Sequence, residues 1–222
     1  MEVKSTVLQI SRKLFPGITA HCRAYHKLIW NKDSYLHTTG WMQSLRTSVP
    51  ADRYANPIPW MNYSVIKFLE DRLKGDLVLF EFGSGYSTRF YAARARSVTS
   101  VEYDETWLKI ISTQMPENVE LVFQNKDVDG NYCRTIGATG KTFDVVVVDG
   151  RDRVNCVKQA IPSLTPRGVI LLDDSQRDRY REGIEFAKQK GFRALDLEGL
   201  KATGKELNRT TIFYRDGNCL GI

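Results

Sequence analysis

From residue 76 onward, short apolar runs rich in Val, Ile, Leu and Phe alternate with longer amphipathic or polar stretches. Several runs are apolar at successive positions, which is typical of strands covered by helices on both faces. The expected strands lie at residues 77–82, 98–102, 119–123, 143–148 and 169–173. Helices are expected near residues 87–95, 105–115, 153–163 and 177–190, the last ended by Gly191. This alternation predicts an α/β fold with a Rossmann-like, doubly wound sheet.

Two more strands, at residues 192–197 and 210–215, complete an expected sheet of about seven strands. The second of them follows a polar loop rather than a helix, so we expect it to run antiparallel at or near an edge. The sheet is therefore predicted to be mostly parallel with a late antiparallel strand. It belongs to a domain over residues 60–222, which begins with a helix at residues 60–73.

Residues 1–59 follow a different pattern, a mixture of helix and loop that we interpret as an N-terminal extension or lid. Val3, Val7, Ile10 and Leu14 recur at helical spacing next to basic residues, which predicts a short amphipathic helix. Such a helix would dock on its own domain or on a partner subunit in a homo-oligomer. Peripheral contact with a membrane surface is the alternative.

The net charge of +6 is concentrated in the first third of the 222 residues. Residues 1–75 hold 11 Lys and Arg against 5 Asp and Glu, whereas residues 76–222 hold 21 of each. The larger part has no excess of positive charge for a polyanion, which argues against nucleic acid as a partner. No apolar run approaches the roughly 20 residues needed to cross a bilayer. Four separated cysteines without a C-x-x-C pair indicate reduced thiols in a cytoplasmic protein.

The most informative stretch is Leu77-Val-Leu-Phe-Glu-Phe-Gly-Ser-Gly-Tyr-Ser-Thr88, an apolar run that leads into a glycine-rich turn and the start of a helix. Gly83 and Gly85 allow the backbone to turn sharply and a ligand to approach it closely. Ser87 or Thr88 can cap the helix, whose free N–H groups then face the ligand. The stretch therefore predicts a binding loop for a cofactor.

Two acids define which cofactor suits this loop. Glu102 ends the next expected strand, 19 residues after Gly83, and can accept hydrogen bonds from both hydroxyls of a ribose. Glu81 precedes the first glycine, and Thr88 replaces the third glycine of a dinucleotide-binding pattern. A carboxylate at residue 81 suits a ligand with an ammonium group better than a pyrophosphate, which disfavours an NAD-dependent oxidoreductase.

The pattern Glu81-x-Gly83-x-Gly85 followed by Glu102 resembles the class I S-adenosylmethionine-dependent methyltransferases, and the resemblance covers about residues 60–222 in the order of elements. It implies S-adenosylmethionine as the cofactor. In that family the glycine loop contacts the methionine part, the acid after the second strand holds the ribose, and residues after the third strand flank the adenine. The cofactor-binding residues expected here are Glu81, Gly83, Ser84, Gly85, Ser87, Glu102, Tyr103, Asn125 and Asp127.

Three acids, Asp149, Asp173 and Asp174, stand at the ends of the fourth and fifth expected strands. Because ligands gather outside the carboxyl ends of parallel strands, we expect these side chains on the rim that carries the cofactor loop. They would repel one another unless cations intervene. One solution is a divalent metal, Mg²⁺ or similar, held by all three acids. This arrangement resembles some metal-dependent O-methyltransferases, although Ser175 stands where an Asn is usual and no Lys follows the first acid closely.

A second solution needs no metal: Arg151 and Arg153 neutralise the acids, and one Asp acts as general base or substrate clamp. In a third interpretation the acids only cap the helices that follow them. The sequence leaves these three alternatives open.

The residues together predict methyl transfer to a hydroxyl of a small-molecule acceptor, a sugar or a phenolic compound. Transfer from a sulfonium needs alignment and a base for the acceptor, and the candidates are Asp149 and His37 of the N-terminal segment. A noncatalytic cofactor-binding or interaction module, docking through its basic N-terminus, is the alternative function. The acids beyond the cofactor loop favour chemistry.

Overall fold

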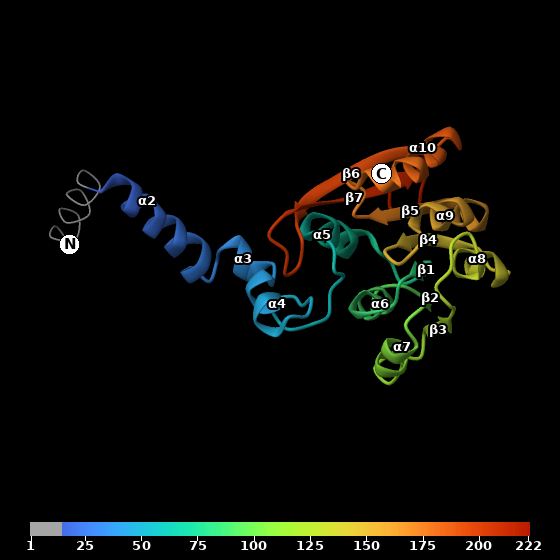
Figure 1. The fold of residues 1–222 in the computed structure, drawn as a ribbon, viewed down its shortest axis with the longest axis horizontal. Helices are drawn as coiled ribbons and strands as arrows, with labels where there is room; N and C mark the ends of the chain where they lie inside the picture. The colour runs from blue at the N-terminus through green and yellow to red at the C-terminus, as the bar shows by residue number, and fades with distance from the viewer. Residues whose placement is uncertain (1–14) are drawn as a thin grey trace. The chain divides into compact units, whose positions relative to one another are not determined.

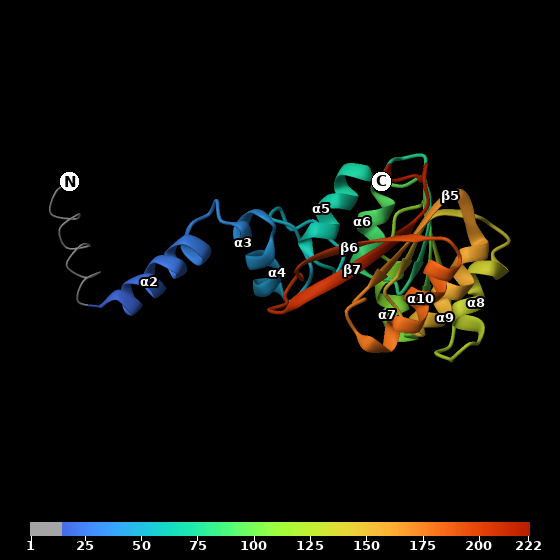
Figure 2. The ribbon, with the colours of Figure 1, turned by 90° about the horizontal axis from the view of Figure 1, so that it is seen from above.

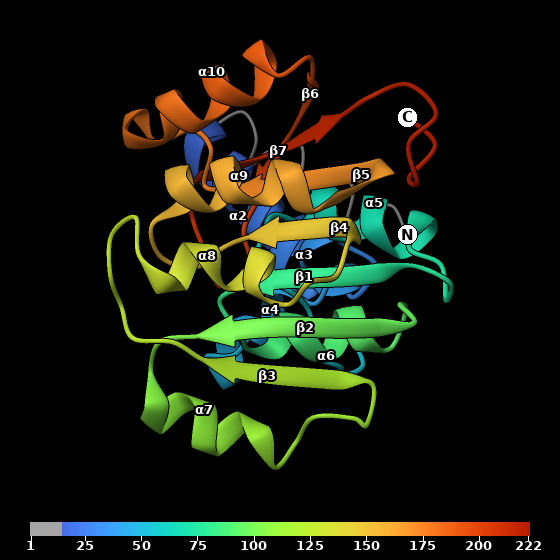
Figure 3. The same ribbon diagram turned by 90° about the vertical axis from the view of Figure 1, so that its right-hand side faces the viewer.

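The computed structural model of the protein describes residues 15–222. These described residues divide into two compact units, with the boundary between Asn56 and Pro57. The larger unit contains the strands β1 (Val78–Phe82), β2 (Ser97–Glu102), β3 (Val119–Phe123), β4 (Phe143–Val148), β5 (Leu164–Asp173), β6 (Arg193–Leu200) and β7 (Leu207–Tyr214). They form one seven-stranded sheet in the order β3-β2-β1-β4-β5-β7-β6, which Figure 3 shows.

Strands β1 to β5 are parallel, and β7 lies antiparallel between β5 and β6. Because β7 is antiparallel to both neighbours, β6 runs in the direction of β5, and its C-terminal end lies on the same rim as those of β1, β4 and β5. The strand order reverses between β1 and β4. In open α/β sheets this reversal is where ligands bind.

Helices cover both faces of the sheet (Figures 1 and 2). One face carries α5 (Tyr63–Arg72) and α6 (Tyr86–Ala92). The other carries α8 (Asn131–Ala138), α9 (Arg153–Ala160) and α10 (Arg181–Gln189), which pack side by side. Helix α7 (Glu105–Ser112) packs beside β3, and the short 3-10 turns η2 (Ile161–Ser163) and η3 (Asp178–Tyr180) precede β5 and α10.

Local sequence explains several of these elements. The Asn62 side chain accepts a hydrogen bond from the Val65 N–H at 3.0 Å and so caps α5. Asp104 caps α7 in the same way through the Trp107 N–H at 2.9 Å. The four consecutive valines of β4, residues 145–148, are fully buried, as expected of a central strand with helices on both sides.

The core on the α8 to α10 side of the sheet is rich in aromatic rings. Phe80 meets Phe82 and Phe143 edge to face, with ring centroids 4.8 and 5.1 Å apart. Each ring is fully buried. Burial of one such side chain is worth about 1.5–3 kcal/mol, so this cluster holds β1 and β4 together beneath the rim where their loops meet.

The sequence-based expectations for the domain are confirmed in type and order, with differences at the ends of elements. β5 begins at Leu164 rather than residue 169, because its first part pairs with Phe143 before an irregularity in the register. β6 continues to Leu200, three residues beyond the expected end. Helix α8 was not expected, because Thr and Gly lower its helix propensity, although Tyr132, Cys133 and Ile136 form its buried side.

The smaller unit consists of α2 (Pro16–Tyr25), a π-helical turn η1 (His26–Trp30), α3 (Tyr35–Thr38), α4 (Trp41–Thr47) and the loops between them. This agrees with the expected mixture of helix and loop. The amphipathic helix predicted from Val3, Val7, Ile10 and Leu14 lies outside the described residues. Within residues 15–222, no helix is long and apolar enough to span a membrane.

Candidate functional site

The loop after β1 is held against the loop after β4. Gly83 has a φ of +99°, and a Cβ added to it would lie 2.9 Å from the Cα atom of Gly150. Only glycine satisfies both the left-handed backbone and this close approach. The contact places the predicted cofactor loop directly beside Asp149, at the reversal of strand order.

Glu81 lies behind the loop, and its carboxylate is fully buried. The hydroxyls of Ser87, Thr88 and Ser100 donate hydrogen bonds to it, from Thr88 at 2.5 Å and from Ser100 at 2.8 Å. Burial raises the pKa of Glu81 to about 7, although the three hydroxyls act to lower it. Glu81 thus ties α6 and β2 to the loop. Its predicted contact with a ligand's ammonium group stays a prediction, since its oxygens here accept from protein hydroxyls.

Glu102 points at the glycine loop. Its Oε2 accepts from the Ser84 N–H at 3.0 Å, and its Oε1 accepts from the Tyr103 and Asp104 N–H groups at 2.8 and 2.9 Å. Burial raises the pKa of Glu102, and the three N–H groups oppose that rise. An ionised carboxylate oxygen can accept two hydrogen bonds, so Oε2 retains an acceptor position for a ribose hydroxyl. The indole N–H of Trp107 closes the loop further by donating to the Ser84 carbonyl at 3.0 Å.

The other predicted cofactor residues have different surroundings. Tyr103 follows Glu102, and the Arg151 guanidinium lies 4.9 Å from its ring centroid and donates to its hydroxyl at 2.8 Å. Asp127 accepts from two N–H groups at the start of α8, those of Asn131 and Tyr132. Asn125 is exposed in the loop after β3. The structure therefore brings Gly83, Ser84, Gly85 and Glu102 together, and it gives Arg151 a partner other than the three acids.

Arg153 joins the ends of β4 and β5. This largely buried guanidinium pairs with Asp149 Oδ1 at 2.8 Å and donates to the backbone carbonyls of Asp149 and Asp173 at 2.9 and 2.6 Å. It also lies 3.6 Å from Asp174 Oδ2. The second solution predicted from the sequence thus holds for Arg153, which neutralises the acids, but not for Arg151.

Lys201 is the second cation of the cluster, and the sequence did not point to it. Its Nζ lies 2.9 Å from Asp173 Oδ2 and 3.2 Å from Asp174 Oδ1. Arg177 contributes a third positive charge, at 2.7 Å from Asp174 Oδ2. Burial acts to lower the pKa of Lys201, but the surrounding carboxylates raise it by more, so the ammonium form is favoured.

Neutral donors complete the cluster. Thr210 Oγ1 donates to Asp173 Oδ1 at 2.7 Å, and Asn208 donates to Asp174 Oδ1 at 2.8 Å. Behind them, the Asn62 amide donates to the side chains of both Asn208 and Thr210. Asp174 itself adopts a left-handed backbone with φ of +55°. Such a conformation is costly for a residue other than glycine and persists only where several partners fix it.

These contacts do not support the predicted metal site of Asp149, Asp173 and Asp174. Within residues 15–222, no group of three His, Cys, Asp or Glu side chains is arranged to hold a metal ion. The cause lies in the donor set: every carboxylate of the cluster already contacts Arg153, Lys201 or Arg177. Three cations repel a divalent ion and satisfy the charge that it would neutralise. The structure does not support the metal.

Asp149 differs from its two neighbours in its surroundings. Burial and the nearby Asp173 raise the pKa of Asp149 to about 7, although Arg153 acts to lower it. For Asp174, burial also acts to raise the pKa. The positive charges of Lys201, Arg153 and Arg177 lower it by more, so the pKa of Asp174 lies below its usual value. Asp149 is therefore better suited than Asp174 to take up a proton near neutral pH.

His37, the second predicted base, belongs to the smaller unit. It lies in α3, and its Nε2 is 2.7 Å from the backbone carbonyl of Ile29. A carbonyl only accepts, so Nε2 carries the proton and the ring ties α3 to the preceding turn. Its role as a base stays a prediction.

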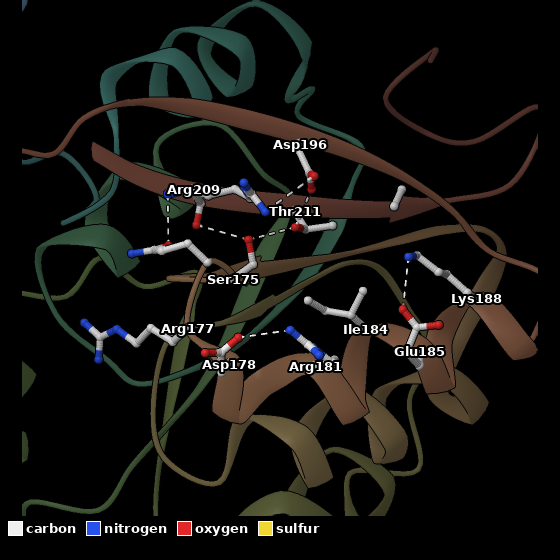
Figure 4. Close-up of a pocket in the computed structure, with 12 residues that line it drawn as sticks. Ser175, Arg177, Asp178, Arg181, Ile184, Glu185, Lys188, Asp196, Arg209 and Thr211 are labelled. Carbon is white, nitrogen blue, oxygen red and sulfur yellow. Dashed lines mark hydrogen bonds and ion pairs between the residues drawn. The ribbon is translucent and has the colours of Figure 1, made fainter. Parts of the chain in front are cut away.

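A polar pocket of about 240 Å³ opens beside the acid cluster, between α10 and strands β6 and β7 (Figure 4). Ser175, next to Asp174, forms part of its wall, and Thr211 donates to Ser175 at 2.7 Å. Most charges around it are paired within the wall, for example Asp178 with Arg181 and Glu185 with Lys188. The pocket therefore adjoins the candidate site but presents little unpaired charge of its own.

Comparison with known proteins assigns this geometry. Residues 80–175, which include the glycine loop, Glu102, Asp149 and the two acids at the end of β5, match a family model described as a methyltransferase domain. The chain contains a class I S-adenosylmethionine-dependent methyltransferase domain. A comparison with curated protein sequences gave no match.

Solved methyltransferase structures share the fold. A methyltransferase-like protein from Silicibacter pomeroyi is 25% identical, with a TM-score of 0.50 over 72% of this chain and 90% of that one. A caffeoyl-CoA O-methyltransferase-like protein from Staphylococcus aureus is 15% identical, with a TM-score of 0.53 over 88% and 98%. A precorrin-6y C5,15-methyltransferase from Geobacter metallireducens is 16% identical, with a TM-score of 0.54 over 69% and 88%. The last two likenesses concern the fold alone.

Sequence reasoning missed several residues of this methyltransferase site, above all Lys201. The alternating residues Ala194 to Leu200 carried the signal that β6 extends to residue 200. With that end in place, Lys201 would have been expected on the rim with the acids. The Asn62 amide and the Trp107 indole act through contacts distant in sequence, and no local pattern indicated them.

Proposed function

We propose that this methyltransferase methylates a hydroxyl oxygen of a small acceptor, a sugar or a phenolic compound. The observation that carries the proposal is the position of Asp149. The close approach of Gly83 to Gly150 sets the backbone of Asp149 directly beside the cofactor loop, on the rim where we expect the acceptor to enter.

The residues around the glycine loop fit S-adenosylmethionine. A Cβ added to Gly85 would meet no atom nearer than the Trp107 ring at 4.0 Å, so there is space in front of this backbone for a ligand. Gly83 to Gly85 would hold the methionine part, and Glu102 would hold the ribose through Oε2. Bound S-adenosylmethionine supplies a methyl group on a sulfonium sulfur, which an oxygen nucleophile takes while the electron pair of the broken bond stays on sulfur.

In this proposal Asp149 removes the acceptor's proton. Its Oδ1 is fixed by Arg153 at 2.8 Å, and within residues 15–222 no hydrogen-bond donor contacts Oδ2. Its side chain is 20% exposed, in contrast to Asp173 at 0%. The free oxygen can therefore accept the hydroxyl proton while Arg153 keeps the carboxylate oriented. General-base catalysis of this kind contributes about 100-fold to 10,000-fold in rate.

Mass spectrometry of methyl transfer to a panel of sugars, phenols and primary amines tests the proposal, with cofactor affinity measured by calorimetry. We expect methylation of hydroxyl acceptors. Asp149→Asn should lower kcat by at least about 100-fold and leave the affinity for S-adenosylmethionine within about twofold. Asp178→Asn, at a 94% exposed side chain, is the matched control and should change neither. Transfer to amines alone, or full activity of Asp149→Asn, would overturn the proposal.

A further inference from the structure

We propose that Lys201 takes the place of a divalent cation in this methyltransferase: its ammonium group binds the reacting oxygen of the acceptor beside Asp149, and no metal ion takes part. The inference rests on the proposed O-methylation and assigns a cation to its acceptor site. It also defines the acceptor class, because one N–H binds one oxygen, whereas a divalent ion would favour two vicinal oxygens.

The first support is the hydrogen bonding of the ammonium group. It has three N–H donors, and Asp173 Oδ2 and Asp174 Oδ1 accept from two of them. Within residues 15–222 no third acceptor contacts it, so one N–H is available to a ligand. The Lys201 side chain is 21% exposed, whereas Asp173 and Asp174 are 0% and 6% exposed. Of Lys201, Asp173 and Asp174, the lysine ammonium is therefore the group that faces outward.

The second support is the rigidity of the lysine's position. Lys201 pairs with Asn62 in an antiparallel bridge, and the next residue, Ala202, donates its N–H to the Met61 carbonyl at 3.2 Å. The fully buried Asn62 amide also donates to the Leu197 carbonyl near the end of β6. A cation fixed in this way before the acceptor arrives loses little on reorganisation, which is the condition for effective electrostatic stabilisation.

The third support is the charge balance at the rim. When Asp149 is ionised, the acids Asp149, Asp173 and Asp174 carry three negative charges, and Arg153, Arg177 and Lys201 carry three positive ones. Arg153 is held by backbone carbonyls as well as by Asp149. Arg177 contacts Asp174 Oδ2, whereas Lys201 contacts Asp174 Oδ1. Among these three described cations, Lys201 combines a position fixed through its backbone with partial exposure and an N–H available to a ligand. The positive charge of Lys201 also acts on Asp149, because it lowers the pKa of that acid.

In this proposal, two side chains account for the proton and the charge of the acceptor hydroxyl without a metal ion. As Asp149 Oδ2 takes up the hydroxyl proton, the acceptor oxygen gains negative charge, and the Lys201 ammonium stabilises that charge through a charge-assisted hydrogen bond. A metal ion would stabilise the same charge as a Lewis acid. We therefore expect acceptors with a single hydroxyl to be methylated as well as vicinal diols.

The test has a binding arm and an activity arm. The binding arm uses calorimetry with Mg²⁺ and Mn²⁺ on wild type, Lys201→Gln, and Lys188→Gln as a matched control at a surface lysine. Wild type and control should show no binding at millimolar metal, whereas Lys201→Gln, which leaves Asp173 and Asp174 without their ammonium, should bind. Stoichiometric binding of metal by wild type would overturn the proposal even if no acceptor were found.

The activity arm compares monohydroxyl and vicinal-diol phenols with and without a chelator. Wild type should keep its rate within about twofold in the chelator. Lys201→Gln should lose at least about 100-fold in kcat/KM for the acceptor, with unchanged affinity for S-adenosylmethionine, and Lys201→Arg should recover part of the loss. Loss of wild-type activity in the chelator, or an unchanged Lys201→Gln, would overturn the role of Lys201. Absence of any transfer to hydroxyls by wild type would instead refute the proposed function.

Circular dichroism and the affinity for S-adenosylmethionine establish whether each variant is folded. If Lys201→Gln does not fold, the activity of Lys201→Arg decides the role of the ammonium group.

Discussion

Replacement of Glu81 by Gln tests how the cofactor loop is stabilised. In the folded protein this carboxyl is fully buried, and burial raises its pKa from 4.5 to about 7. In the unfolded chain it is solvated and ionises near its ordinary value. The folded protein therefore holds a proton on Glu81 at pH values where the unfolded chain has released it.

The sign and size of the effect follow from this difference. The stabilising contribution of protonated Glu81 is fully present below the unfolded pKa and is lost as the pH rises through the folded pKa. Between pH 5 and about 7, each pH unit lowers the free energy of unfolding by about 1.4 kcal/mol. From pH 5 to pH 8 the loss from this group amounts to about 2.5 kcal/mol.

Urea unfolding at pH 5, 6, 7 and 8, followed by tryptophan fluorescence, measures the effect. Gln at residue 81 binds no proton, so the free energy of unfolding of Glu81→Gln minus that of wild type should rise by about 2.5 kcal/mol over this range. The absolute stability of the variant does not matter, because only the slope is compared. Glu185→Gln, at a half-exposed side chain on α10, should give a difference that does not change with pH. A flat difference for Glu81→Gln as well would refute the reasoning, since Glu81 would then ionise in the fold as it does in water.

Two further substitutions test the backbone around the same loop. Gly83→Ala forces a side chain into a left-handed backbone and to 2.9 Å from Gly150, so it should cost at least about 2 kcal/mol in urea unfolding and weaken S-adenosylmethionine binding more than tenfold in calorimetry; normal affinity would show that the loop can move without harm. Asp104→Ala removes the cap of α7 and should lower the free energy of unfolding by about 1 kcal/mol, whereas Asp104→Asn, an equally good cap, should keep it within about 0.3 kcal/mol. Equal losses in the two Asp104 variants would contradict the capping role.

The cofactor side of the site could be predicted because its information is local. Gly83, Gly85 and Glu102 lie within two consecutive strand-loop units, and the hydrophobic pattern placed both strands correctly. The function of Glu81 was harder to infer, because its three hydroxyl partners come from α6 and from β2. The sequence indicated only a contact of Glu81 with a ligand, which stays a prediction, and it gave no sign of these three hydrogen bonds within the protein.

The acceptor side was predicted only in part, because it depends on contacts between distant segments. The acids at the ends of β4 and β5 were expected on one rim, and the structure brings them together. What neutralises them was not decided by sequence, since Lys201 lies 28 residues after Asp173 and reaches it only through the order of β5, β7 and β6. Arg151 and Arg153 are two residues apart, and only the path of the chain into α9 sends them to different partners.

The separation of Lys201 from the glycine loop has an evolutionary consequence. The expected cofactor-binding residues all lie between Glu81 and Asp127, whereas the acceptor's proposed cation is carried by the hairpin of β6 and β7 at the opposite edge of the sheet. Insertions or exchanges in that hairpin can therefore alter which acceptors bind without changing the residues that bind the methyl donor. The architecture allows acceptor specificity to change while the cofactor-binding loop stays the same.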